Sequence, residues 1–388
     1  MFRQYFLKTT FGLLLSQWLV LIQRNFQVVF ADKLNLSLMI LQVPLIAMLI
    51  IVAFYNFDDD KQNFDEAARI IYYFDLMKEP LKEANQMINI NKLHRYAKIL
   101  ALESDFDTRN EYIQKIITPF FDQKNVQISD LDLFLTEKVK LISDMASMRR
   151  GSVYFLLVAA SIWFGIMNAC KEIVTEQPLL KRETRSYLHI FPYLSAKLFV
   201  LTVILGIQTA LLSLIVVPSL LELSWNHVLW SWLILWVAAF VSATMGLFIS
   251  SIVTNYRVAL TFIPLLMIPQ LLFGGLLRPQ VDLTHNLIWS HLAYVVSAIT
   301  IQRWAFESIL TTDVYAVGGI LKLQVNPRET GEFDLVEAKN TSLVSSFFKP
   351  RQWGQLDVGH RWPPLFYLLA AGLFSFIGSY LALRWRFS

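Results

Sequence analysis

The residues whose types could support chemistry are the charged residues, six histidines and one cysteine, and no catalytic spacing joins them. His285 and His291 are six residues apart, so they do not share one face of a helix. The motifs GxxxxGK[ST], GxGxxG, HExxH and GxSxG are absent from the sequence. The single cysteine, Cys170, cannot form an intramolecular disulfide. We therefore expect no catalytic residue, no metal site and no cofactor in this chain.

One short strip instead concentrates charge between two apolar runs. KEIVTEQPLLKRETRSYLHIFPYLSAK, residues 171–197, holds eight formal charges, whereas the run before it and the run after it hold none. The strip is too short to fold as a domain of its own, since domains rarely have fewer than about 50 residues. Its charges therefore have to be explained by what lies on either side of them or by a partner.

The uncharged runs predict a membrane protein. Apolar residues make up 55% of the sequence and charged residues 16%, against about 45–50% and about 25% in ordinary soluble domains. None of the formal charges falls in six runs of 19 to 26 residues, and about 20 apolar residues suffice to cross a bilayer. These runs are 34–57, 152–170, 198–220, 228–253, 259–277 and 364–383. We therefore predict an all-α integral membrane protein with six transmembrane helices.

The distribution of positive charge predicts the orientation of these spans. Residues 1–33 fit an amphipathic helix in the membrane interface, and a simple cytosolic helix is the alternative. Together with 171–197, 254–258 and 384–388, they carry twelve Lys and Arg against four Asp and Glu. Short positive segments stay in the cytoplasm. We therefore place both termini and the strip on the cytoplasmic side.

Two long segments lie on the opposite side in this topology. Residues 58–151 have apolar positions three and four residues apart, which predicts helices. They could form a cap over the first two spans or a docking surface for an external partner. Residues 278–363 begin with an apolar stretch interrupted by charges, which favours helices that lie in or dip into the outer leaflet, and continue as a more polar region.

Uncharged polar residues and prolines occur inside the predicted spans. We expect the polar residues to hydrogen-bond between helices, at about 0.6 kcal/mol on average, with a substrate-facing role for Gln42 or Ser161 as the alternative. These polar residues are Gln42, Ser161, Asn168, Thr202, Gln208, Ser242, Thr244 and Gln270. The lack of charge in the spans disfavours ion-coupled transport. Pro264 and Pro269 precede Gly274 and Gly275, which indicates either a gate or close helix packing.

Three segments, in the right order, resemble a known transporter family. The strip resembles the cytoplasmic loop between spans two and three of type-2 ABC exporter permeases, in particular the white or G subfamily and its bacterial relatives. The matching residues are Glu176, Arg182-Glu183 and Tyr193 with Lys197. IPQLLFGGLLRP and RWAFESIL are similar to the end of the fifth span and a later segment, and LIQRNFQVVFADKLNL to the connecting helix. The chain departs from the subfamily in Ser297-Ala298, where Ser-Pro is usual, in its long 58–151 insertion, and in lacking the external cysteines. We expect the ATPase domain, which is fused upstream in the subfamily, on a separate subunit.

The resemblance implies a mechanism and roles for seven residues. Two permease copies would enclose a cavity, and separate ATP-binding cassette subunits would bind ATP and magnesium and switch it between inward and outward states. Residues 171–197 would be the cytoplasmic coupling loop, with a short coupling helix in which Glu176, Lys181, Arg182 and Glu183 dock on the ATPase or form ion pairs. A solvated connector is the alternative reading of the loop. Phe164 matches a cavity aromatic, and Leu276 and Leu277 match the pair that closes the cavity to the outside, with core or lipid packing as the alternative.

We therefore expect the permease subunit of an ABC exporter for a lipid or another amphipathic substrate in a bacterial cytoplasmic membrane. Its expected partners are ATP-binding subunits, a second permease copy and membrane lipids, with no nucleic acid. The alternative is a non-transporting scaffold that recruits partners through residues 58–151. A membrane acyl- or glycosyltransferase is disfavoured because no acid, base or histidine constellation is present.

Overall fold

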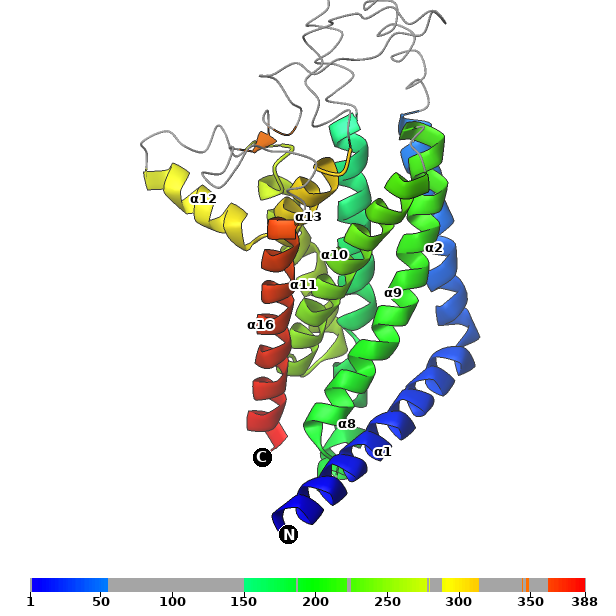
Figure 1. Cartoon of the computed structure of the whole chain (residues 1–388), viewed down its shortest axis with the longest axis vertical. Helices are drawn as coiled ribbons and strands as arrows, with labels where there is room; N and C mark the ends of the chain where they lie inside the picture. The colour runs from blue at the N-terminus through cyan, green and yellow to red at the C-terminus, as the bar shows by residue number, and fades with distance from the viewer. Residues whose placement is uncertain are drawn as a thin grey trace, which may run out of the picture. The chain divides into compact units, whose positions relative to one another are not determined.

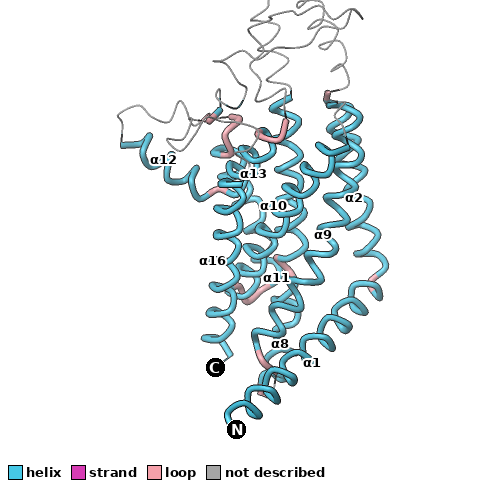
Figure 2. Tube along the Cα trace, in the orientation of Figure 1, coloured by secondary structure: helices cyan, strands magenta, loops and turns pink. Residues whose placement is uncertain are grey.

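Helices form all the regular structure that can be described in this chain. The computed structural model describes residues 2–54, 150–185, 188–221, 225–277, 279, 288–313, 344, 347–348 and 362–387. Within these ranges no strand occurs (Figure 2). Six helices are long and apolar enough to cross a membrane. The prediction of an all-α membrane protein with six spans is therefore confirmed.

The described helices are labelled in Figure 1, except the one over residues 150–169, and two long segments, 54–149 and 311–361, interrupt their succession along the chain. The helices are α1 (Phe2–Ala31), α2 (Lys33–Ala53), a helix over 150–169, α8 (Glu172–Thr184), α9 (Ile190–Leu221), α10 (Trp225–Ile252), α11 (Tyr256–Phe273), α12 (Ile288–Ile299), α13 (Ile301–Leu310) and α16 (Trp362–Phe387). The start of α1, the end of α16 and α8 all lie at the same end of the bundle (Figure 1).

All of these helices belong to one compact unit. A second unit consists of residues 56–147 and 320–339, and it lies outside the described residues. It contains most of the predicted external insertion 58–151. The helices predicted there, and a partner bound through them, therefore stay predictions, as does the polar part of the 278–363 region.

Asp32 separates the first helix from the first span. Its carboxylate accepts a hydrogen bond from the backbone N–H of Asn35 at 3.1 Å, so Asp32 is the N-cap of α2. On the other side of Asp32, α1 packs along α9, where the rings of Trp18 and Phe199 meet edge to face with 5.5 Å between their centroids. Helices α1 and α2 run at an angle to each other, on either side of Asp32 (Figure 1).

Close packing of helix 150–169 against α10 builds the interior of the bundle. A Cβ atom on Gly165 would lie 2.3 Å from the carbonyl oxygen of Ala239, and one on Gly246 would lie 2.8 Å from the Cβ of Ala169. Glycine at both positions lets the two backbones approach. By contrast α2, α11 and α16 expose large apolar side chains along much of their length, as helices in contact with lipid do.

The uncharged polar residues of the spans divide into two groups, apart from Gln42, whose buried Nε2 has no hydrogen-bond partner among the described residues. The amides bond between helices: Asn168 Nδ2 donates to Gln208 Oε1 at 2.8 Å, and Gln208 Nε2 donates to the carbonyl of Met39 at 2.7 Å. Gln270 Oε1 likewise accepts from the backbone N–H of Gln302 at 2.9 Å. The hydroxyls of Ser161, Thr202, Ser242 and Thr244 instead donate to carbonyls three or four residues earlier in their own helices. The prediction of bonds between helices is thus confirmed for three amides and wrong for the four hydroxyls.

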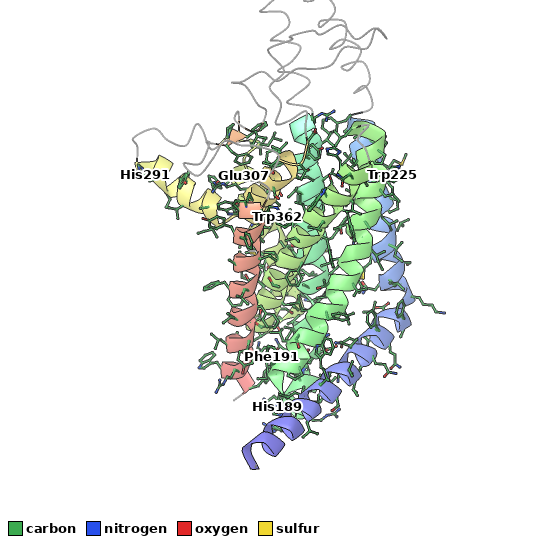
Figure 3. All side chains as sticks on the ribbon, viewed as in Figure 1. His189, Phe191, Trp225, His291, Glu307 and Trp362 are labelled. Carbon is green, nitrogen blue, oxygen red and sulfur yellow. The ribbon has the colours of Figure 1, made fainter. Side chains whose placement is uncertain are left out.

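Tryptophan side chains mark the two ends of the bundle. Trp225 and Trp362 lie at one end, and His189 and Phe191 lie at the opposite end (Figure 3). Trp385 in the last turn of α16 is 89% exposed. Exposed tryptophan at helix ends is typical of the two interfaces between a membrane and water.

Candidate functional site

The short helix α8 lies within the charged strip and begins beside the C-terminal end of α10. Helix 150–169 ends in a turn at Cys170 and Lys171, and α8 follows. The hydroxyl oxygen of Ser250 in α10 accepts hydrogen bonds from the backbone N–H groups of Ile173 and Val174, both at 3.0 Å. Because the first N–H groups of a helix have no partner within it, Ser250 caps α8 from a neighbouring helix.

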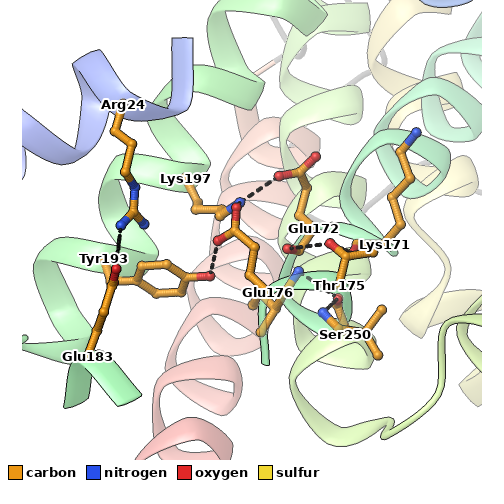
Figure 4. A network of polar contacts seen from close by, with 11 residues as sticks. Arg24, Lys171, Glu172, Thr175, Glu176, Glu183, Tyr193, Lys197 and Ser250 are labelled. Atoms are coloured by element: carbon orange, nitrogen blue, oxygen red, sulfur yellow. Dashed lines mark hydrogen bonds and ion pairs between the residues drawn. The ribbon is translucent and has the colours of Figure 1, made fainter. Parts of the chain in front are cut away.

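A buried lysine joins α8 to α9. Lys197 is 4% exposed, and its Nζ lies 2.8 Å from Glu172 Oε2 and 2.8 Å from Glu176 Oε1 (Figure 4). The hydroxyl of Tyr193 donates to the other oxygen of Glu176 at 2.9 Å. Tyr193 and Lys197 are four residues apart and share a face of α9. A buried ammonium is stable only when it is paired in this way, so this group fixes α8 against α9.

The end of α8 is tied to the first helix of the chain. Arg24 Nη1 donates to both carboxylate oxygens of Glu183, at 3.0 and 3.1 Å (Figure 4). The two side chains are 30% and 29% exposed, so the pair contributes about 0–1 kcal/mol to stability. Its main effect is geometric, because it links α8 to a helix 159 positions earlier in the sequence.

Lys181 and Arg182 point away from these contacts. Both side chains are exposed, and both lie in the last turn of α8, where positive charge complements the helix dipole. The four residues predicted to dock on a partner or form ion pairs therefore divide into two pairs. Glu176 and Glu183 contact other helices of this chain, whereas Lys181 and Arg182 present positive charge to the surroundings.

A second arginine attaches α8 to the last helix. Arg386 in α16 donates from Nη2 to Gln177 Oε1 at 3.2 Å, and from Nη1 to the carbonyls of Ser251 and Val253 at 3.1 and 3.2 Å. Gln177 Nε2 donates to the same Val253 carbonyl at 2.6 Å. Arg386 thereby donates hydrogen bonds to carbonyls at the C-terminal end of α10, where carbonyls lack partners within the helix.

Comparison with known families decides what kind of protein carries this site. Residues 112–310 match the family model described as ABC-2 type transporter. The chain belongs to the ABC-2 type transporter family. No curated protein matches the chain. Membership makes it the membrane permease component of an ABC transporter, a component that is not itself catalytic.

The ABC-2 match covers α8 together with α9 and α10, the helices that carry Lys197 and Ser250. It includes Glu172, Glu176, Lys197 and Ser250, and it ends at the last residue of α13. Arg24 and Arg386 lie outside the matched range. The two arginines that anchor α8 to the first and last helices thus come from parts of the chain that the family match does not cover.

Of the three residues predicted for a cavity and gate in this ABC-2 permease, Phe164 lies far from the adjacent pair Leu276 and Leu277. Phe164 is fully buried within the chain, Leu276 is half-buried, and Leu277 is 64% exposed. Leu276 lies near the start of helix 150–169, where a Cβ on Gly151 would be 3.9 Å from Leu276 Cδ1. Thirteen residues along the same helix separate Gly151 from Phe164, or about 20 Å at 1.5 Å per residue. Phe164 therefore lies in the packed core of this chain and Leu276 at the end of the bundle opposite α8, and the cavity and gate roles of Phe164, Leu276 and Leu277 stay predictions.

Several residues of the α8 site were not predicted from the sequence. Glu172 and Glu176 are four residues apart on α8 and so lie on one face of it. That spacing is a signal that could have predicted a shared cation for the two carboxylates. Arg24, Ser250 and Arg386 carry no such signal, because their contacts join helices distant in the sequence. Within the described ranges no group of three His, Cys, Asp or Glu could hold a metal ion.

Proposed function

We propose that this chain is the permease subunit of an ABC exporter in which α8 is the coupling helix for a separate ATP-binding subunit. The observation that carries the proposal is the position of α8. It contacts α1 through Glu183, α9 through Glu172 and Glu176, α10 through its own backbone N–H groups on Ser250, and α16 through Gln177. A movement imposed on α8 would therefore be shared by four other helices as a rigid-body displacement.

The exposed end of α8 supplies the docking charges in this proposal. Lys181 and Arg182 would contact acidic residues of the ATP-binding subunit, while Glu176 and Glu183 keep α8 attached to the permease. A docking surface of this kind accelerates association and selects the partner through charge complementarity. If residues 171–197 were only a solvated connector, contacts of α8 with four other helices would not be expected.

The finer parts of the proposal follow the family resemblance. We propose a dimer of two permease copies, export rather than import, relation to the white or G subfamily, and a bacterial cytoplasmic membrane with both termini in the cytoplasm. The positions of the chain ends support the last point, since both lie at the α8 end of the bundle (Figure 1). The uncharged spans support a lipid or another amphipathic substrate, because an ionic substrate would require charged groups along its path.

Charge reversal at the end of α8 tests the docking role. The double variant Lys181→Glu/Arg182→Glu should lose co-purification with the ATP-binding subunit at least about tenfold, since removing close charge pairs at an interface costs more than about 1.4 kcal/mol. The control is Arg384→Glu, which reverses another exposed cation at the end of α16. Binding retained in the double variant would show that α8 does not dock. Failure of the unmodified chain to bind any ATP-binding subunit would favour the scaffold reading.

A charge swap tests the link between α8 and α1. Glu183→Arg places two arginines together and should reduce the vanadate-sensitive ATPase activity of the purified complex. The double variant Glu183→Arg/Arg24→Glu restores an opposite-charge pair and should recover that activity. Full activity in the single variant would remove Glu183 from the coupling role, and an inactive but folded double variant would show that the pair itself is not what matters.

A further inference from the structure

The chain makes a tight turn where α11 ends, at the end of the bundle opposite α8. Gly274 and Gly275 are the first two residues of this turn. Gly275 has φ +105°, a backbone conformation that residues with a Cβ rarely adopt. A Cβ on Gly274 would lie 2.3 Å from Gln302 Cγ and 2.8 Å from the Phe155 ring. The turn therefore sits directly on α13 and on the start of helix 150–169.

Polar contacts brace this turn from the side of α13. Gln302 donates from its backbone N–H to Gln270 Oε1 at 2.9 Å and from Nε2 to the carbonyl of Phe155 at 2.8 Å. Ser297 donates to the carbonyl of Phe273 at 3.1 Å. The last turn of α11 is thus attached to both α12 and α13, so one side of the glycine turn is held by hydrogen bonds.

Two phenylalanines from a later part of the chain cover the turn. Phe348 is fully buried and Phe347 is 3% exposed. A Cβ on Gly275 would lie 2.9 Å from the Phe348 ring, and one on Gly151 would lie 3.2 Å from the Phe347 ring. The two rings therefore rest on the backbone of the turn and on the helix start beside Leu276.

An aromatic cluster holds these two rings in place. Phe306 in α13 lies 5.5 Å from Phe347 and 5.7 Å from Phe348, measured between ring centroids. Phe306 also meets the ring of Phe155 at 5.4 Å, edge to face. The ring of Phe155 lies against Gly274, and the rings of Phe306 and Phe348 lie against Gly275, so the cluster contacts the glycine backbone directly.

We propose that Phe347 and Phe348 are a latch that keeps the Gly274–Leu277 turn in its closed position. The proposal rests on the proposed function and on the family resemblance, which implies that Leu276 and Leu277 close the substrate cavity toward the outside. Among the described residues, the hydrogen bonds that brace the turn come from α12 and α13, and weak apolar contacts from the two rings add to them. Opening requires the rings to leave the backbone of Gly275, after which the turn and Leu276 are free to move. The two phenylalanines are positioning residues, because they act on the leucines and need not touch the substrate.

Cysteine accessibility in the full chain tests the latch. The only native cysteine, Cys170, is buried, so Cys170→Ala/Leu276→Cys leaves one reporter thiol. Right-side-out and inside-out membrane vesicles are treated with a membrane-impermeant maleimide, and the labelling rate of position 276 is measured. Adding Phe348→Ala should raise that rate at least about tenfold, which corresponds to about 1.4 kcal/mol in favour of the open turn. Phe348→Leu, which keeps part of the apolar volume, should give an intermediate rate and serves if the alanine variant does not fold.

The matched control is Phe374→Ala, which removes an 81% exposed ring from α16 and should leave the labelling rate unchanged. Equal labelling rates in the parent, Phe348→Leu and any folded Phe348→Ala variant would overturn the latch. A rise seen in inside-out vesicles alone would support the latch and overturn the orientation assumed in the proposed function. A rise in right-side-out vesicles alone would support both.

Discussion

Lys197 balances the charge of the α8 site. It is the buried partner of two carboxylates that are only 25% and 20% exposed, and the hydroxyl of Tyr193 satisfies a further oxygen of Glu176. Without the ammonium, Glu172 and Glu176 would stand one helical turn apart as like charges. The pair of carboxylates therefore depends on Lys197, and α8 depends on the pair for its attachment to α9.

Replacing Lys197 should therefore destabilise the whole permease. We expect Lys197→Met to lower the free energy of unfolding by about 1–3 kcal/mol, less than a fully buried pair because the carboxylates keep some contact with water. The measurement is the midpoint of thermal aggregation in detergent. The matched control is Lys197→Met with Glu172→Gln and Glu176→Gln, which removes the unpaired charges and should recover much of the loss. An unchanged midpoint in the single variant would contradict the assigned pairing.

At the scale of an element, Ser250 of α10 caps the N-terminus of another helix, α8. Its hydroxyl oxygen replaces the N-cap that Lys171, at the N-cap position of α8, does not supply from its own side chain. Ser251 next to it donates to the carbonyl of Phe248 within α10. Two adjacent serines of similar chemistry thus have different roles, one between helices and one within a helix.

Removing the Ser250 hydroxyl should loosen the start of α8. Loss of an N-cap costs about 1 kcal/mol, so Ser250→Ala should speed hydrogen exchange at the amides of Ile173 and Val174 about fivefold. Ser251→Ala is the matched control and should leave these amides unchanged. Equal exchange in the two variants would show that Ser250 does not cap α8.

The spans and α8 could be predicted from the sequence, whereas the contacts of α8 could not. Uncharged runs are a direct consequence of the bilayer, so they predict six spans without any knowledge of packing. Spacing along a helix places Tyr193 and Lys197 on one face, but it carries no information on Arg24, 159 positions before its partner Glu183. Phe347 and Phe348 were missed because two apolar residues within a polar stretch show no periodicity.

At the scale of the whole molecule, the two ends of the bundle are held in different ways. At the α8 end, charged side chains from α1, α9 and α16 converge on one short helix. At the opposite end, apolar rings enclose a glycine turn. Helix 150–169 reaches both ends, because it begins beside Leu276 and leads into α8. Its packing against α10 therefore determines whether a displacement at one end can reach the other.

Gly165 is the position where that packing is most easily tested. A Cβ there would lie 1.9 Å from Ser242 Oγ and 2.3 Å from the Ala239 carbonyl oxygen; the serine hydroxyl can rotate away, but the carbonyl belongs to the α10 backbone. Gly165→Ala should therefore force the two helices apart and lower the yield of folded protein and its thermal midpoint. Gly12 in α1 has nothing within 4 Å of a Cβ, so Gly12→Ala should raise stability slightly, by up to about 1 kcal/mol, as expected for an exposed helical glycine. Glycine to alanine should thus lower the stability of the protein at position 165 and raise it at position 12. A Gly165→Ala variant as stable as the unmodified chain would show that helix 150–169 and α10 do not approach this closely.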